Sequence, residues 1–269
     1  MISLFEVLKN LSTQDEIILL MIRSILRIED KIRNILSQNN IVGYNPTGDL
    51  TFAFDRAVEE MLIKSLREEG FSGMIIGEEL GKQEGTVRKE LIILDPIDGS
   101  ANASRGFPYY STLLAYLENN IPKRSVVWYP MLNIFYYAIK GNGAYKLTQK
   151  KEFRLKTDAR HYPKMLIEVL PENPVEYILK IRSLGKFRHA GSIGLSICLI
   201  ADNVLDVFID ITKKGRVLDY ISSLLILEEA GGMYIMEPNT TNPYEKIKVI
   251  AARNKEIFDK FVKEFWKSQ

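Results

Sequence analysis

The sequence Leu-Ile-Ile-Leu-Asp-Pro-Ile-Asp-Gly-Ser at residues 91–100 constrains the fold and the chemistry of this chain more than any other stretch. Its leading apolar residues predict a buried strand, and Pro96 ends that strand in a turn. Asp95 and Asp98 lie three positions apart in the turn and supply two hard oxygen ligands of the kind that divalent cations bind. Such a string is also typical of a tight surface turn, so the rest of the chain has to decide between the two interpretations.

The two residues after Asp98 predict a place for an anion. Gly99 allows the backbone to approach a ligand closely, and Ser100 supplies a hydroxyl and is typical of a helix N-cap. Backbone N–H groups at a helix N-terminus attract anions such as phosphate. The stretch therefore indicates a site for a divalent cation and a phosphate together.

Composition excludes several other classes of protein. The 269 residues carry a formal net charge of +2, without the lysine and arginine runs of a nucleic-acid-binding surface. The single cysteine, Cys198, excludes an internal disulfide and predicts a buried thiol in a reducing compartment. Charged residues interrupt the apolar residues near the N-terminus, so we expect no signal peptide, no membrane span and a cytoplasmic protein. Abundant isoleucine, lysine and glutamate favour a thermophilic source.

The first half of the chain predicts helices packed on a mostly antiparallel sheet. Helices are expected within residues 3–37 and over residues 50–69, which Gly70 ends, with a polar break over 38–48. Strands are expected at residues 74–76, 91–94, 111–117, 123–129, 134–139 and 144–147. The Gly-Asn-Gly turn at 141–143 favours an antiparallel hairpin.

In the second half, strands alternate with helices. Strands are predicted at residues 165–169, 187–190, 204–209, 233–236 and 247–251, and helices at residues 175–183, 192–201, 220–230 and 257–266. Alternation of this kind predicts an α/β layer. We therefore expect an N-terminal α+β domain over residues 1–150, with most metal ligands, and a C-terminal α/β domain over residues 151–269.

Three short motifs follow one another in order: Gly-Glu-Glu at residues 77–79, the turn at residues 95–100, and Asp219 followed by Glu-Ala-Gly-Gly at residues 229–232. Their spacing resembles the signature of the inositol monophosphatase-like family of metal-dependent, lithium-sensitive phosphatases. Residues 102–108 and Asp210 look most like the archaeal enzymes that act on both inositol monophosphate and fructose 1,6-bisphosphate. The resemblance covers nearly the whole chain and implies a layered αβαβα sandwich of the sugar phosphatase type.

The resemblance implies a hydrolase with two to three Mg²⁺ in each active site. The implied ligands are Glu78, Asp95 and the Ile97 carbonyl for one ion, Asp95, Asp98 and Asp219 for a second, and Asp55 with Glu78 through waters for a third. Carboxylates this close cannot all stay ionised unless cations neutralise them, and Mg²⁺ prefers oxygen ligands. Mn²⁺ is a candidate substitute and Li⁺ a candidate inhibitor. Asp219 alone is equally typical of a helix cap.

The family resemblance also implies how the site would act on a phosphate ester. Glu78 and the Ser100 hydroxyl would hold an attacking water, with Asp55 beside them, and the N–H groups of Gly99 and Ser100 would hold the phosphate. No covalent phosphoenzyme is needed. The implied substrate contacts are Arg188 for a second phosphate, Gly191, Ser192 and Ile193 for the polyol, and Asp210 for sugar hydroxyls. The substrates would be inositol 1-phosphate and fructose 1,6-bisphosphate, and the protein a homodimer or homotetramer.

Three positions depart from the family pattern. Ser100 replaces the commoner threonine and keeps the hydroxyl, and Leu218 stands where many relatives carry tryptophan. The segment Asn-Pro-Thr-Gly-Asp at residues 45–49 lacks the lysine of some relatives, which puts the contribution of this loop in doubt.

Three other functions compete with this interpretation. A haloacid dehalogenase-type phosphatase would place its two aspartates two positions apart, whereas here they are three apart with a proline between. A non-catalytic phosphate-binding module would be signalled by loss of Glu78 or Ser100, and both are present. A 3′-phosphoadenosine nucleotide phosphatase of the same family would need aromatic residues that stack on the base, and the sequence does not place any.

Overall fold

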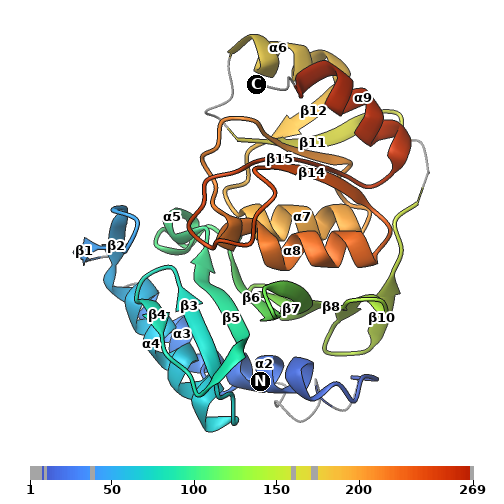
Figure 1. Cartoon of the computed structure of the whole chain (residues 1–269). Helices are drawn as coiled ribbons and strands as arrows, with labels where there is room; N and C mark the ends of the chain where they lie inside the picture. Colours follow the sequence, from blue (N-terminus) through green and yellow to red (C-terminus); the bar gives the residue numbers. More distant parts are fainter. Residues whose placement is uncertain (1–7, 9–10, 37–39, 159–161, 171–174, 267–269) are drawn as a thin grey trace.

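The computed structural model describes residue 8 and residues 11–36, 40–158, 162–170 and 175–266. Helices and sheets alternate in five layers through the molecule (Figure 1). The order is helices α2 and α4, an eight-stranded sheet, helices α7 and α8, a five-stranded sheet, and helices α6 and α9. This arrangement confirms the predicted layered sandwich.

The outer helix layer follows from amphipathic sequence. Helix α2, Glu16–Leu26, begins where the Asp15 side chain accepts hydrogen bonds from the N–H groups of Ile17 and Ile18, and α3 spans Glu29–Ile35. Helix α4, Ala53–Glu68, buries its apolar side against the first sheet. It begins three residues later than predicted because Leu50–Phe52 forms strand β2, which pairs with β1, Ile41–Tyr44.

The eight-stranded sheet has the order β10-β9-β8-β7-β6-β5-β3-β4. Its strands are β3 Gly73–Gly77, β4 Gly81–Gln83, β5 Val87–Asp98, β6 Ser111–Glu118, β7 Ile121–Tyr129, β8 Ile134–Ile139, β9 Gly143–Leu147 and β10 Glu152–Leu155. Only β3 and β5 pair in parallel, and the other pairs are antiparallel. Strand β5 runs four residues beyond its predicted end and so carries both aspartates of the turn.

The five-stranded sheet has the order β12-β11-β13-β15-β14. Its strands are β11 Met165–Val169, β12 Gly185–Arg188, β13 Val207–Asp210, β14 Met233–Glu237 and β15 Lys248–Ala252. The outer helices on this sheet are α6, Val175–Leu184, and α9, Lys255–Phe265. Strand β10 at residues 152–155 still belongs to the first sheet. The domain boundary near residue 150 stays a prediction.

Two helices fill the space between the sheets. Helix α7, Ile193–Ala201, and helix α8, Val217–Glu229, bury almost all their side chains against both sheets, and Cys198 is among them. Their N-termini face the end of β5 that carries the aspartates (Figure 1). Within the described ranges, no helix combines the length and the apolar character that crossing a membrane requires.

Candidate active site

A bulge in β5 separates the two aspartates of the central stretch. Asp95 lies opposite Leu113 and Asp98 opposite Ser111, so β5 carries one more residue than β6 between these pairs. The Asp95 side chain is buried, and its Oδ1 atom has no hydrogen-bond partner in the protein. A buried carboxylate oxygen without a partner is unfavourable unless a ligand satisfies it.

Glu78 comes next to Asp95 because β3 and β5 are parallel. Gly77 pairs with Leu94, so the next residues of both strands lie side by side at the carboxyl ends. Burial raises the pKa of Glu78 well above its usual value, and the charges of Asp219, Glu79 and Asp55 raise it further. Burial also raises the pKa of Asp95, and the charges of Glu78 and Asp98 raise it further.

Asp55 reaches the same place from the first turn of α4. Its side chain is buried, and burial together with the charge of Glu79 raises its pKa to about 8. The Ser100 hydroxyl lies 3.1 Å from Asp55 Oδ1 and 2.8 Å from the carbonyl oxygen of Ile97. The structure therefore brings Asp55, the Ile97 carbonyl and Ser100 together, and their catalytic and metal-binding roles stay predictions.

Asp219 lies in the first turn of α8, which begins three residues earlier than predicted. Its Oδ2 atom accepts a hydrogen bond from the N–H of Arg216, the N-cap residue, at 2.6 Å. The helix-cap interpretation of Asp219 is thus correct for one oxygen atom. Burial raises its pKa to about 7, with a contribution from Asp98.

Asp98 holds the N-terminus of α7. Its Oδ1 accepts from the N–H of Ile193 at 2.9 Å, and its Oδ2 accepts from the N–H of Gly194 at 2.8 Å. The hydroxyls of Ser111 and Ser192 also donate to Oδ2, at 2.9 and 2.5 Å. Ser192 occupies the N-cap position but makes no cap hydrogen bond itself. A serine before this helix predicts an N-cap, and that prediction is wrong, because Asp98 of β5 accepts the free N–H groups of α7 instead.

The carboxylates fit a divalent metal in chemistry and burial, although Asp98 and Asp219 also accept hydrogen bonds from protein groups. Of the residues described, no three His, Cys, Asp or Glu side chains converge as a ready ligand set. The unpartnered Asp95 Oδ1 and the raised pKa values of Asp55, Glu78 and Asp95 both indicate negative charge that the protein alone does not neutralise. Oxygen donors of this kind are the ligands that Mg²⁺ prefers.

Gly99 allows the close contact between the two halves of the site. It has φ of 100°, and a Cβ atom there would lie 2.9 Å from the carbonyl oxygen of Gly191. Gly99 is the N-cap of the short helix α5, Ser100–Ala103, so Ser100 is its first residue and not the predicted cap. The Asn102 side chain donates to the carbonyl oxygen of Ala190 at 2.7 Å and closes the contact.

The predicted substrate residues lie in different surroundings. Gly191, Ser192 and Ile193 lie beside Gly99 and Asp98 at the N-terminus of α7. The exposed Arg188 donates to the carbonyl oxygen of Phe187. Asp210 does not face a substrate: it is fully buried, and its carboxylate accepts hydrogen bonds from Thr212 N, Thr212 Oγ1 and Tyr220 Oη. Asp210 thus organises the loop before α8.

Sequence reasoning missed two buried glutamates. Glu59 on α4 accepts hydrogen bonds from the N–H groups of Glu79 and Leu80, both at 2.8 Å, and so holds the turn after Glu78. Glu168 on β11 accepts from the N–H of Ala190 at 2.7 Å and holds the segment before α7. Burial raises the pKa of each to about 7. The signal available in the sequence was that Glu59 and Glu168 occupy positions on the apolar faces of their helix and strand.

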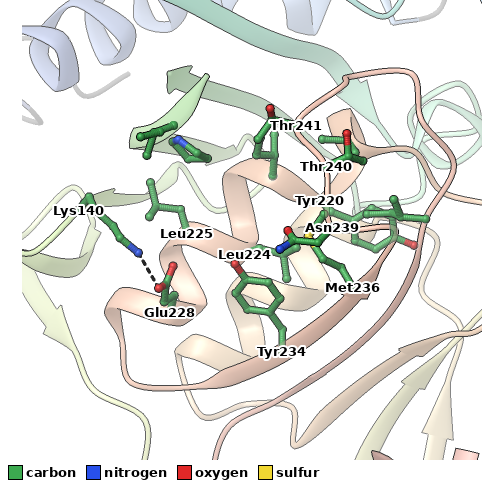
Figure 2. A pocket seen from close by; sticks show the side chains of 15 residues that line it. Lys140, Tyr220, Leu224, Leu225, Glu228, Tyr234, Met236, Asn239, Thr240 and Thr241 are labelled. Atoms are coloured by element: carbon green, nitrogen blue, oxygen red, sulfur yellow. Dashed lines mark hydrogen bonds and ion pairs between the residues drawn. The ribbon is translucent and has the colours of Figure 1, made fainter. Parts of the chain in front are cut away.

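A separate cavity lies on another side of α8. Its volume is about 220 Å³, and it lies between α8, Tyr234 and Met236 of β14, and the segment Asn239 to Thr241 (Figure 2). An ion pair between Lys140 and Glu228 stands beside it. None of the predicted metal ligands is among the described residues that line this cavity, so it is distinct from the carboxylate site.

Comparison with known proteins decides the family. Residues 13–269 match the family model described as "Inositol monophosphatase family". The chain belongs to the inositol monophosphatase family. It is a phosphoric monoester hydrolase by this membership, which confirms the predicted enzyme class.

Individual members of the inositol monophosphatase family agree in length and fold. The chain is 29% identical over 224 residues to a fructose-1,6-bisphosphatase/inositol-1-monophosphatase of Methanocaldococcus jannaschii, covering 81% of this chain and 86% of the relative. A crystal structure of an inositol monophosphatase–fructose 1,6-bisphosphatase superposes with a TM-score of 0.76 at 28% identity, covering 88% of this chain and 94% of the other. An inositol monophosphatase/NADP phosphatase solved with Mg²⁺ and phosphate has the same fold, with a TM-score of 0.78 at 18% identity over 94% of this chain and 96% of the other.

Proposed function

We propose that this chain is a Mg²⁺-dependent phosphatase that acts on inositol 1-phosphate, fructose 1,6-bisphosphate or both. The observation that supports this most is the buried, unpartnered Oδ1 atom of Asp95 among carboxylates with raised pKa values, beside Gly99 and the first turn of α5. A relative with both activities in its name covers most of the chain.

The residues that would hold the metal are Glu78, Asp95, the carbonyl of Ile97, Asp98, Asp219 and Asp55. When bound, Mg²⁺ would polarise the attacking water and neutralise the charge that develops on the phosphoryl group and the leaving oxygen. Asp98 already accepts from three donors at the N-terminus of α7 and from Ser111 of β6, which leaves Oδ1 as the oxygen with room for a further partner.

The protein's own groups would orient the reactants. The Ser100 hydroxyl, held near Asp55 and the Ile97 carbonyl, would fix the position of a water on the side of Glu78. The N–H groups of Gly99 and Ser100 would hold the phosphate oxygens. Ser192 and Ile193, fixed by Asp98, would lie beside the polyol, and Arg188 at the rim would contact a second phosphate.

A nucleotide phosphate is the second candidate substrate, because one structural neighbour is named as an NADP phosphatase. Phosphate release with Mg²⁺ should be measured for inositol 1-phosphate, fructose 1,6-bisphosphate, NADP and 3′-phosphoadenosine 5′-phosphate. We expect the first two to be hydrolysed fastest. Preference for either nucleotide would overturn the substrate assignment, and no hydrolysis of any would overturn the proposed function.

A further inference from the structure

The segment at residues 45–49 forms a tight turn that the Asn45 side chain organises. Asn45 is buried, and its Oδ1 atom accepts from the N–H of Thr47 at 3.0 Å, the Thr47 hydroxyl at 2.7 Å and the N–H of Asp49 at 2.9 Å. The backbone N–H of Asn45 also donates to the carbonyl oxygen of Asp49 at 2.9 Å. The turn is therefore an internally bonded unit.

One ion pair joins this turn to the other half of the site. The Arg216 Nη2 atom lies 2.6 Å from Asp49 Oδ2, and the Arg216 side chain is 10% exposed whereas that of Asp49 is 57% exposed. Arg216 is also the N-cap of α8, and its backbone N–H donates to Asp219 Oδ2 at 2.6 Å. A single residue thus contacts both the turn and a proposed metal ligand.

The surrounding charge explains why the turn needs a cation. The β1–β2 hairpin stands at the N-terminal end of α4 (Figure 1). The Thr51 hydroxyl in this hairpin donates to Glu79 Oε2 at 2.5 Å. Burial raises the pKa of Glu79, and the nearby charge of Asp49 raises it further, whereas that of Arg56 lowers it. The turn itself contains no lysine. Without Arg216, Asp49 would be left near the acidic Glu79 without its ion-pair partner.

We propose that the Arg216–Asp49 ion pair is a latch that holds the 45–49 turn beside the carboxylate cluster and couples its position to Asp219. Arg216 is a positioning residue in this proposal, which rests on the proposed phosphatase function. It supplies from α8 the positive charge that the turn lacks. Because the arginine is largely buried, the pair is screened less by solvent than a surface ion pair.

Charge removal distinguishes this latch from simple packing. Arg216→Gln removes the cation that pairs with Asp49 and leaves Asp49 near Glu79, so the turn should move away and the substitution should be the most harmful. Asp49→Asn removes both the attraction and the repulsion and should be milder. The double variant should be more active than Arg216→Gln alone, a recovery that loss of arginine packing would not produce.

The experiment compares these three variants with Glu237→Gln. Like Asp49→Asn, Glu237→Gln neutralises the more exposed partner of a buried cation. That cation is Lys248 on β15, whose Nζ atom lies 2.8 Å from Oε2 of Glu237 on β14. Hydrogen exchange is followed at the amides of Asn45, Thr47, Gly48 and Asp49, and phosphate release is measured against Mg²⁺ concentration. For Arg216→Gln we expect faster exchange at the turn and a rate about 10- to 100-fold lower, with the control unchanged.

Each outcome decides the proposal. Unchanged exchange at residues 45–49 in Arg216→Gln would overturn the latch, and so would a double variant no more active than Arg216→Gln. A wild-type protein without phosphatase activity would instead overturn the proposed function. The exchange measurement would then still test whether Arg216 and Asp49 hold the turn, because it requires no substrate.

Discussion

The Glu59 carboxylate occupies the space that any side chain at Gly77 would need. A Cβ atom at Gly77 would lie 1.9 Å from Glu59 Oε1, and both oxygens of Glu59 accept hydrogen bonds from the turn after Glu78. The buried Glu59 carboxylate therefore fixes the position of the turn that carries Glu78. A glycine is required there for space alone, because Gly77 is not among the residues with positive φ.

Gly77→Ala should displace the Glu59 carboxylate and the turn that it holds. We expect a loss of about 1–3 kcal/mol in the free energy of unfolding and a larger relative loss of phosphatase rate, since Glu78 moves with the turn. Gly141→Ala is a suitable comparison, because a Cβ atom there meets nothing within 4 Å while its φ of 80° brings its own strain. Urea unfolding and phosphate release measure the two effects. Equal activity in both variants would contradict this role of Glu59.

The metal-free protein should lose stability as pH rises. The pKa of Asp55 is raised from 3.8 to about 8, and the pKa values of Glu59 and Asp219 are raised to about 7. At a pH between the unfolded and the folded pKa of each group, the folded state binds more protons than the unfolded state. The free energy of unfolding is therefore greatest below the unfolded pKa and falls as pH rises through the folded pKa.

Melting temperatures in EDTA at pH 5 and pH 8 test this dependence, which should be flatter in Asp55→Asn. Mg²⁺ should raise the melting temperature more at pH 8, because the ligands must be deprotonated to bind it. If the melting temperature of the wild type in EDTA changed with pH no more than that of Asp55→Asn, the raised pKa of Asp55 would be refuted.

The hydroxyl at residue 100 should matter more than its methyl group. Ser100→Thr keeps the oxygen near Asp55 and the Ile97 carbonyl, and we expect activity close to that of wild type. Ser100→Ala removes the oxygen and should reduce kcat about 100- to 1000-fold, the usual range for losing an oriented polar group in an active site. Equal kcat values for the alanine and threonine variants would exclude Ser100 from water positioning.

Sequence placed Glu78, Asp95 and Asp219 at element ends, while their grouping as metal ligands came from the family resemblance and stays a prediction. The parallel pairing of β3 with β5 then brings Glu78 beside Asp95 without further information. Glu59 and Glu168 escaped prediction because a buried glutamate on a helix or strand looks like a boundary residue until its partners are known. Those partners are distant in sequence, as with Glu168 and Ala190.

The errors at α7 and at Asp210 have the same cause. Ser192 has the residue type and position of a cap, yet Asp98 from the other sheet accepts the free N–H groups of α7. Asp210 ends a strand like a site residue, yet it turns inward to Thr212 and Tyr220. The contacts of Asp98 with α7 and of Asp210 with Tyr220 decided the two cases, and the sequence pattern around each residue does not contain these contacts.

The most direct test of the carboxylate site as a metal-dependent phosphatase centre is the Mg²⁺ dependence of phosphate release by wild type and Asp95→Asn. Inositol 1-phosphate and fructose 1,6-bisphosphate are the substrates, and circular dichroism checks that the variant is folded. We predict saturable activation of the wild type by Mg²⁺ and no activation of the folded variant. Phosphate release by Asp95→Asn with the Mg²⁺ dependence of wild type would contradict the assignment of the site.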